Sequence, residues 1–228
     1  MIGIIGAMKT ETDALVSAMQ ERKETTISGI TYTSGRLWTK EVVVATCGIG
    51  KVFAAVCAQT MILTFSPSLI INTGVAGTLT FALGIGDIAL AERLVQHDMD
   101  TSPLGDPVGL VSGINRIYFD ADADTLARLD ACVSAVGAKG VRGCIASGDQ
   151  FIADPTKKAY IRDTFSAIAC EMEGAAIAHV ATINQTPFAV LRAISDSADG
   201  GATEDYPTFV ARAAARSVEV LHRFLSDR

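Results

Sequence analysis

The sequence predicts a single α/β domain spanning residues 1–228. Short apolar runs rich in β-branched residues alternate with longer segments whose apolar residues recur at helical spacing, which is the pattern of strands connected by helices. Several of the short runs are apolar at nearly every position, as is typical of strands covered on both faces. A chain of 228 residues with 49% hydrophobic content can also bury one large core.

The short apolar runs are expected to be strands, and they comprise residues 2–5, 42–46, 69–72, 87–94, 141–146 and 188–194. The longer segments between them are expected to be helices, at residues 10–21, 51–65, 123–136, 156–164, 172–183 and 207–225. Residues 30–37 precede the strand at 42–46 and are expected to pair with it as an antiparallel hairpin. Residues 97–113, rich in Asp, Pro and Gly, are expected to form a long functional loop.

Charge and cysteine content limit the class of protein. The chain has 25 acidic and 19 basic residues, a net charge of -6 and no basic stripe, so nucleic acid is not an expected partner. Five cysteines, odd in number and widely spaced, suit reduced core residues and predict a cytoplasmic protein. No apolar run has the length of a signal or a membrane span, so no membrane association is expected.

Motifs for other chemistries are incomplete. Gly48-Ile49-Gly50-Lys51 resembles half of a phosphate-binding loop, but Val52 stands where such a loop needs Ser or Thr. The 3 histidines and 5 cysteines lack metal-ligand spacing, so neither a metal nor another cofactor is expected. The chain has no Gly-x-Ser-x-Gly sequence, so a serine nucleophile of that type is not expected.

Carboxylates follow several of the predicted strands, where ligands bind in open α/β sheets. Glu11 follows the first strand and either acts on a ligand or complements a helix N-terminus. Glu171 and Glu173 follow the apolar run 168–170, and both face the same way only if that segment is still extended. Asp196 ends the last strand, where partial burial would raise its pKa, with Asp199 as either its neighbour or a turn residue.

Six motifs, taken together in this order and spacing, closely resemble those of the 5′-methylthioadenosine/S-adenosylhomocysteine nucleosidases, a branch of the nucleoside phosphorylase-like superfamily. They are Ile4-Ile5-Gly6-Ala7-Met8 with Glu11, Gly48-Ile49-Gly50-Lys51, Asn72-Thr73-Gly74-Val75-Ala76-Gly77, Ser147-Gly148-Asp149-Gln150-Phe151-Ile152, Glu171-Met172-Glu173 and Ala193-Ile194-Ser195-Asp196. The resemblance implies a three-layer α/β/α fold around a mixed, partly barrel-like sheet, a homodimer, and hydrolysis of an adenine nucleoside without a cofactor.

The resemblance also implies a role for particular residues. Glu11 would activate the attacking water, and Asp196 would donate a proton to N7 of the purine. Glu173 and the backbone of Met172 would hold the ribose hydroxyls. The remaining residues expected to bind substrate are Phe151 and Ile152 beside the adenine, Ala76 and Gly77 on the floor of the site, and Ser195, Ile49 and Met8.

The residue types suit this chemistry. Breaking the bond from ribose C1′ to a purine builds positive charge on the sugar and negative charge on the base, which calls for one acid and one base, as in glycoside hydrolysis. Three alternatives stay open: a phosphorylase of the same superfamily, a 6-amino-6-deoxyfutalosine hydrolase, and a nucleoside sensor without activity. Inorganic phosphate would be repelled by an anionic Glu11, and the joint presence of Glu11 and Asp196 argues against a sensor, which has no need for both.

Two features depart from the family pattern, and a third feature, the composition of a loop, suggests a site shared between subunits. Val75 stands where relatives often carry Ser, and Pro103 and Leu104 lie near a position where an aromatic residue is common. The loop at residues 97–113 has more apolar side chains than a solvated loop should expose. We therefore expect an apolar, open-ended pocket for the 5′ substituent that a second subunit completes.

Overall fold

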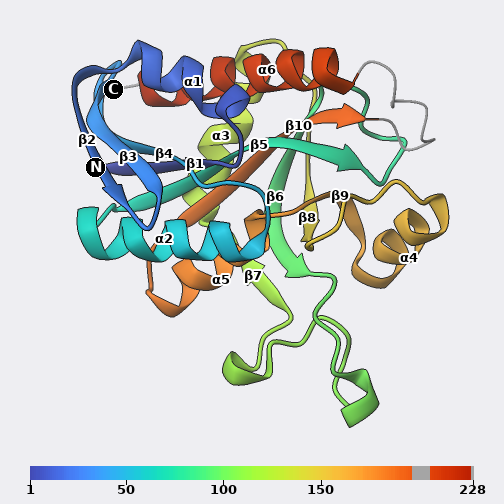
Figure 1. The fold of residues 1–228 in the computed structure, drawn as a ribbon. Helices are drawn as coiled ribbons and strands as arrows, with labels where there is room; N and C mark the ends of the chain where they lie inside the picture. Colours follow the sequence, from blue (N-terminus) through green and yellow to red (C-terminus); the bar gives the residue numbers. More distant parts are fainter. Residues whose placement is uncertain (197–205, 227–228) are drawn as a thin grey trace.

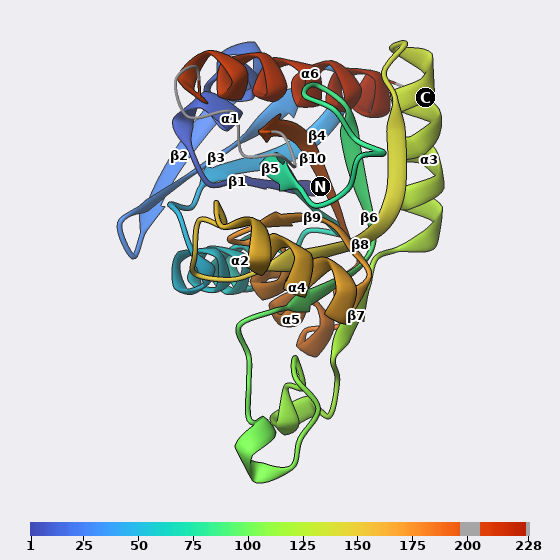
Figure 2. The same ribbon diagram turned by 90° about the vertical axis from the view of Figure 1, so that its right-hand side faces the viewer.

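The computed structural model describes residues 1–196 and 206–226, and within these ranges one mixed sheet lies between two layers of helices (Figures 1 and 2). The helices are α1 (Lys9–Ala18), α2 (Lys51–Phe65), α3 (Ala123–Ala135), α4 (Pro155–Phe165), α5 (Gly174–Ile183) and α6 (Tyr206–Ser226). Helices α1, α3 and α6 pack together on one face of the sheet, while α2 and α5 pack together on the other. The predicted three-layer α/β/α architecture is confirmed.

The sheet combines a closed part and an open part. Its strands are β1 (Ile2–Gly6), β2 (Gln20–Ile27), β3 (Ile30–Leu37), β4 (Lys40–Thr46), β5 (Leu69–Thr78), β6 (Ile88–Gln96), β7 (Tyr118–Asp120), β8 (Gly140–Ser147), β9 (Ala167–Glu171) and β10 (Phe188–Asp196). Strands β10, β6, β8, β9 and β5 follow one another, and β10 also pairs with β5, which closes a barrel. Strands β1, β4, β3 and β2 continue outward from β5 as an open sheet.

Strand β5 belongs to both parts. Its first half pairs in parallel with β1, from Ile2 opposite Leu69 to Ile5 opposite Asn72. Its end pairs antiparallel with β9, where Gly77 lies opposite Cys170, while β10 runs parallel along most of its length. The strand was predicted to end at Asn72, but it continues to Thr78. Pairing with β9 and β10 overrides the weak strand propensity of its glycines.

Three strands were not predicted as such, and each has a weak local signal. Strand β2 was expected to be the end of a helix reaching residue 21, but α1 ends at Ala18 and the chain turns into an edge strand paired with β3. Most residues of β2 are exposed, so it shows no apolar alternation. Strand β7 has three residues, and β9 was noted only as a short apolar run. The hairpin of β3 and β4 is confirmed, as is α2 with its predicted bounds.

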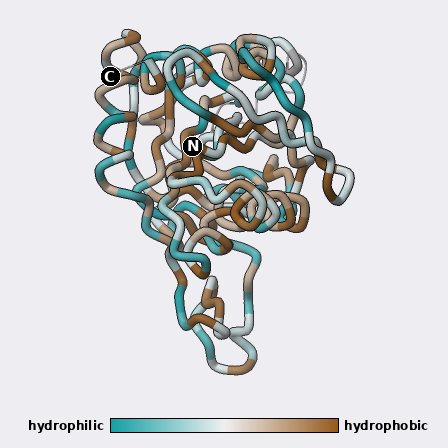
Figure 3. Tube along the Cα trace, turned by 90° about the vertical axis from the view of Figure 1, so that its left-hand side faces the viewer, coloured by the Kyte–Doolittle hydropathy of each residue, from teal (hydrophilic) through white to brown (hydrophobic). Residues whose placement is uncertain are grey.

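The chain between β6 and β7 projects from the body of the molecule, as two views at right angles show (Figures 1 and 2). It contains the loop predicted at residues 97–113 and two short 3-10 helices, Ser102–Leu104 and Ser112–Ile114. Parts of this projection are hydrophobic (Figure 3). Leu104, the last residue of the first of these short helices, is 84% exposed. Among the described helices, none combines the length and hydropathy needed to span a bilayer.

Candidate active site

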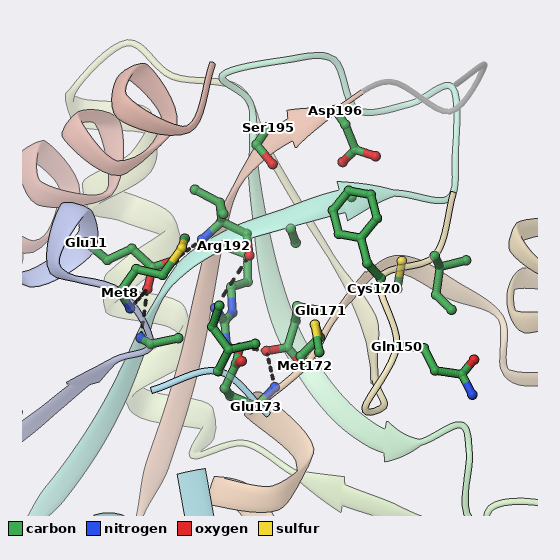
Figure 4. A pocket seen from close by; sticks show the side chains of 17 residues that line it. Met8, Glu11, Gln150, Cys170, Glu171, Met172, Glu173, Arg192, Ser195 and Asp196 are labelled. Carbon is green, nitrogen blue, oxygen red and sulfur yellow. Dashed lines mark hydrogen bonds and ion pairs between the residues drawn. The ribbon is translucent and has the colours of Figure 1, made fainter. Parts of the chain in front are cut away.

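The residues predicted to act on or bind a ligand line one cavity of about 130 Å³ (Figure 4). It lies where β1, β5, β9 and β10 end. The predicted residues in its lining are Met8, Glu11, Ile49, Ala76, Gly77, Phe151, Ile152, Met172, Glu173, Ser195 and Asp196. Ala7, Val75, Gln150, Cys170, Glu171 and Arg192 also contribute to it. Their common location is therefore settled, while the function of each remains a prediction.

Glu11 caps α1 and faces the cavity at the same time, so its two proposed roles do not exclude each other. Its Oε2 accepts hydrogen bonds from the backbone N–H groups of Ala7 at 2.7 Å and Met8 at 2.9 Å. Its Oε1 accepts one from the N–H of Val75 on β5 at 3.0 Å. A Cβ atom at Gly74 would lie 2.5 Å from Glu11 Oε1, so only glycine leaves room for this carboxylate.

Arg192, which sequence reasoning did not single out, lies in the middle of β10 with 1% of its surface exposed. Its Nη2 donates to Asn72 Oδ1 at 2.6 Å, forms an ion pair with Glu171, and lies 3.5 Å from Glu173 Oε2. Burial alone would lower the pKa of Arg192, but Glu171 and Glu173 raise it. A lone charged residue inside an otherwise apolar strand was the sequence signal for this buried ion-pair group.

Glu171 and Glu173 both line the cavity and both form an ion pair with Arg192. Glu171 is the last residue of β9, and Glu173 comes two residues later, at the start of α5. Glu171 ends β9 and accepts hydrogen bonds from Ser147 Oγ and from the N–H groups of Glu173 and Gly174, at 3.1 and 2.8 Å. Through these hydrogen bonds, Glu171 holds the first residues of α5 in place. The role left open for Glu171 is therefore that of a structural anchor.

Glu173 lines the cavity next to the first residues of α2. Its Oε1 accepts a hydrogen bond from the N–H of Gly50 at 2.9 Å. Gly50 has a φ of 101°, a left-handed conformation that favours glycine. Burial raises the pKa of Glu173 to about 7, with Arg192 opposing the shift and Glu171 adding to it.

Asp196 lies across the cavity from Glu11 (Figure 4). A Cβ atom at Gly77 would lie 2.8 Å from Asp196 Oδ1, so this glycine also makes room for a carboxylate. Burial raises the pKa of Asp196, and the nearby ammonium of Lys158 opposes the shift. The expected rise in pKa is confirmed in direction. Asp199, considered as its neighbour, lies outside the described residues.

The opening of the cavity is apolar. Phe151 is 62% exposed, Ile49 is also exposed, and Val75 adds an apolar side chain beside Glu11. Ile152 and Cys170 are buried deeper in the lining. The part of the chain that the structure describes has no group of three or more His, Cys, Asp or Glu residues that could hold a metal ion. The site thus offers two opposed carboxyl groups, a buried ion-pair network and an apolar entrance.

A family model described as the phosphorylase superfamily matches residues 1–226. The chain belongs to this superfamily. A 5′-methylthioadenosine/S-adenosylhomocysteine nucleosidase of Shewanella pealeana is 38% identical over 218 residues, covering 95% of this chain and 94% of the relative. The predicted resemblance to these nucleosidases is confirmed.

Solved structures of this superfamily agree with that relationship. The nucleosidase of Neisseria meningitidis, in complex with methylthio-immucillin-A, has a TM-score of 0.94 and 34% identity, covering 99% of this chain and 98% of the other. A futalosine hydrolase of Helicobacter pylori has a TM-score of 0.92 and 33% identity, covering 98% and 96%. Both comparisons span nearly the whole chain, so this superfamily member shares the complete fold with enzymes of both names.

Proposed function

We propose that this protein hydrolyses the N-glycosidic bond of 5′-methylthioadenosine and S-adenosylhomocysteine and releases adenine. The observation that carries the proposal is the placement of Glu11 and Asp196 on opposite sides of one cavity, in different environments. Glu11 is surrounded by three backbone donors, whereas Asp196 is a partly buried carboxyl with a raised pKa. Two carboxyl groups in different environments suit one base and one acid. Relatives with this activity in their names support the choice of substrate.

The proposed reaction uses both carboxyl groups. The proton of the Asp196 carboxyl group passes to N7 of the purine, and the electron pair of the C1′–N9 bond moves into the base. The oxygen of a water molecule bonds to C1′, and the proton that this water loses passes to Glu11. The acid and the base of this proposed reaction are both side chains that line the cavity, so no cofactor takes part in it.

The ribose is proposed to lie over Glu173 and Met172, between the two catalytic carboxyl groups. As positive charge develops on the sugar, hydrogen bonds from its hydroxyls to Glu173 strengthen. The base would lie against Phe151, with the backbone of Ile152 at its edge and Ala76, Gly77 and Ser195 around it. The apolar residues Met8 and Ile49 at the entrance suit a 5′-thio substituent, because such a group binds mainly by burial.

Replacing Glu173 with Gln is expected to lower kcat more than it raises KM. Gln keeps the size of the side chain and can still contact a hydroxyl, but it lacks the charge that favours a cationic ribose. Steady-state adenine release over a range of 5′-methylthioadenosine concentrations measures both constants. An unchanged kcat with a raised KM would assign Glu173 to ground-state binding. Glu24→Gln, on the exposed strand β2, is the matched control.

The second candidate function is hydrolysis of 6-amino-6-deoxyfutalosine, since a futalosine hydrolase matches the fold with a TM-score of 0.92. Adenine release should be compared for 5′-methylthioadenosine, S-adenosylhomocysteine, 5′-deoxyadenosine and 6-amino-6-deoxyfutalosine. We expect release from the first two in phosphate-free buffer, with no gain when phosphate is added. Preference for the aminodeoxyfutalosine would favour the second function, and a strict need for phosphate would indicate a phosphorylase.

We propose that the protein works as a homodimer whose second subunit completes the entrance to the pocket. On α2, next to the cavity residue Ile49, Val52 is 73% exposed and Phe53 is also exposed. The projection between β6 and β7 adds the exposed Leu104. Large apolar side chains that are exposed in the free subunit are typical of subunit contacts. A fully active monomer in sedimentation experiments would contradict the shared pocket.

The cytoplasm is the proposed location. None of the five cysteines forms a disulfide and all are buried, which suits a compartment that keeps thiols reduced.

A further inference from the structure

Lys158 is a charged side chain on the buried face of α4, at the edge of the active site. It is 5% exposed and shares its helix face with Ile161 and Phe165, which are buried in the apolar cluster that includes Ile152 and Cys170. Helical spacing places these three residues on one side of the helix. Because a buried ammonium is costly without a partner, its position calls for an explanation.

The explanation lies in Asp196. Lys158 Nζ is 3.3 Å from Asp196 Oδ2, and the two side chains are 6% and 13% exposed. On its other side, Asp196 Oδ1 faces Gly77 on β5. Among the described residues that line the cavity, Asp196 is present and Lys158 is not, so the ammonium approaches the carboxyl group from outside the ligand space.

We propose that Lys158 is a positioning residue for the general acid: it orients the Asp196 carboxyl group and stabilises the carboxylate that remains after proton donation. This inference rests on the proposed function. In that reaction the proton leaves Asp196 for N7 of the purine, and the negative charge left behind lies next to a cation. The neighbouring charge makes Asp196 a stronger acid than burial alone would allow.

Other titratable groups near this pair do not replace Lys158. Strand β9 contributes Cys170, whose thiol pKa burial raises to about 12, with Asp196 adding to the shift. The thiol is therefore uncharged at neutral pH. Glu171, at the end of β9, is engaged with Arg192, and β5 contributes only Gly77 at this point. Of the described side chains that act on the pKa of Asp196, Lys158 is the one that favours its ionised form, and a backbone hydrogen bond adds to this effect.

The test is the pH profile of kcat/KM for adenine release from 5′-methylthioadenosine. The rate should fall with rising pH as Asp196 loses its proton, and Lys158→Met should move that fall upward by about one to three pH units. The maximal kcat/KM should drop roughly tenfold, because a weaker acid donates its proton less readily. Lys158→Arg keeps the cation and should restore the wild-type profile. Arg162→Met removes an exposed cation from the same helix and should leave the profile unchanged.

Circular dichroism and melting temperature establish that each variant is folded, and Lys158→Gln replaces Lys158→Met if the latter does not fold. An unchanged profile in the folded variant, or the same shift in Arg162→Met, overturns the role of Lys158 while the proposed hydrolysis stands. A wild-type protein that releases no adenine rejects the proposed function, and this inference with it.

Discussion

Asp196→Asn is expected to lower kcat/KM for adenine release by ~10²–10⁴-fold while the protein remains folded. Asn has nearly the same shape, so it fits beside Gly77, but its amide does not donate a proton to N7 as a carboxylic acid does. Because burial raises the pKa of Asp196, the wild-type acid keeps its proton closer to neutral pH than an exposed Asp would. Wild-type kcat/KM should therefore decline as the pH rises through this pKa.

The measurement is initial-rate adenine release, with melting temperature as the check on folding. Asp163→Asn removes an exposed carboxyl from α4 and should leave both quantities unchanged. Near wild-type turnover in Asp196→Asn would remove this residue from the mechanism.

Glu11→Gln is expected to lower kcat by a similar ~10²–10⁴-fold, since an amide does not accept the proton of the attacking water. It should also destabilise the protein by about 1–3 kcal/mol. Both oxygens of Glu11 accept backbone N–H groups, from Ala7 and Met8 on one side and Val75 on the other. The amide nitrogen of Gln would face one of these donors, which leaves a buried N–H group without an acceptor.

Catalysis and stability can be separated for this variant. Adenine binding by calorimetry reports whether the cavity survives, and urea unfolding reports the loss of stability. A variant that binds adenine but releases none from the nucleoside supports Glu11 as the base. Substantial turnover in a folded Glu11→Gln protein would show that another group activates water.

The elements with strong local patterns could be predicted from the sequence. The helix Lys51–Phe65 has its predicted bounds, and the motifs at the ends of β1, β5, β9 and β10 line the cavity as a group. Strand ends meet at one edge of a sheet, so listing the residues that follow each strand brings the site together without a structure.

What escaped prediction depends on partners distant in the sequence. Arg192 and Lys158 are defined by the carboxylates that they face, and nothing in the neighbouring residues states which carboxylate that is. The edge strand β2 has no buried face, and the extension of β5 through Gly74 and Gly77 depends on pairing with β9 and β10. In each case a tertiary contact outweighs the local propensity.

The two glycines of β5 that admit Glu11 and Asp196 have a consequence for local unfolding. Gly74 and Gly77 lie on one strand, so with a rise of ~3.3 Å per residue they are ~10 Å apart along it. This strand is buried and is hydrogen-bonded to β10 on one edge and to β1 and then β9 on the other. Its amide protons belong with the slowest to exchange with solvent, because they open only with the core. Local opening around the entrance therefore changes access to the cavity while the separation of its two carboxyl groups stays constant.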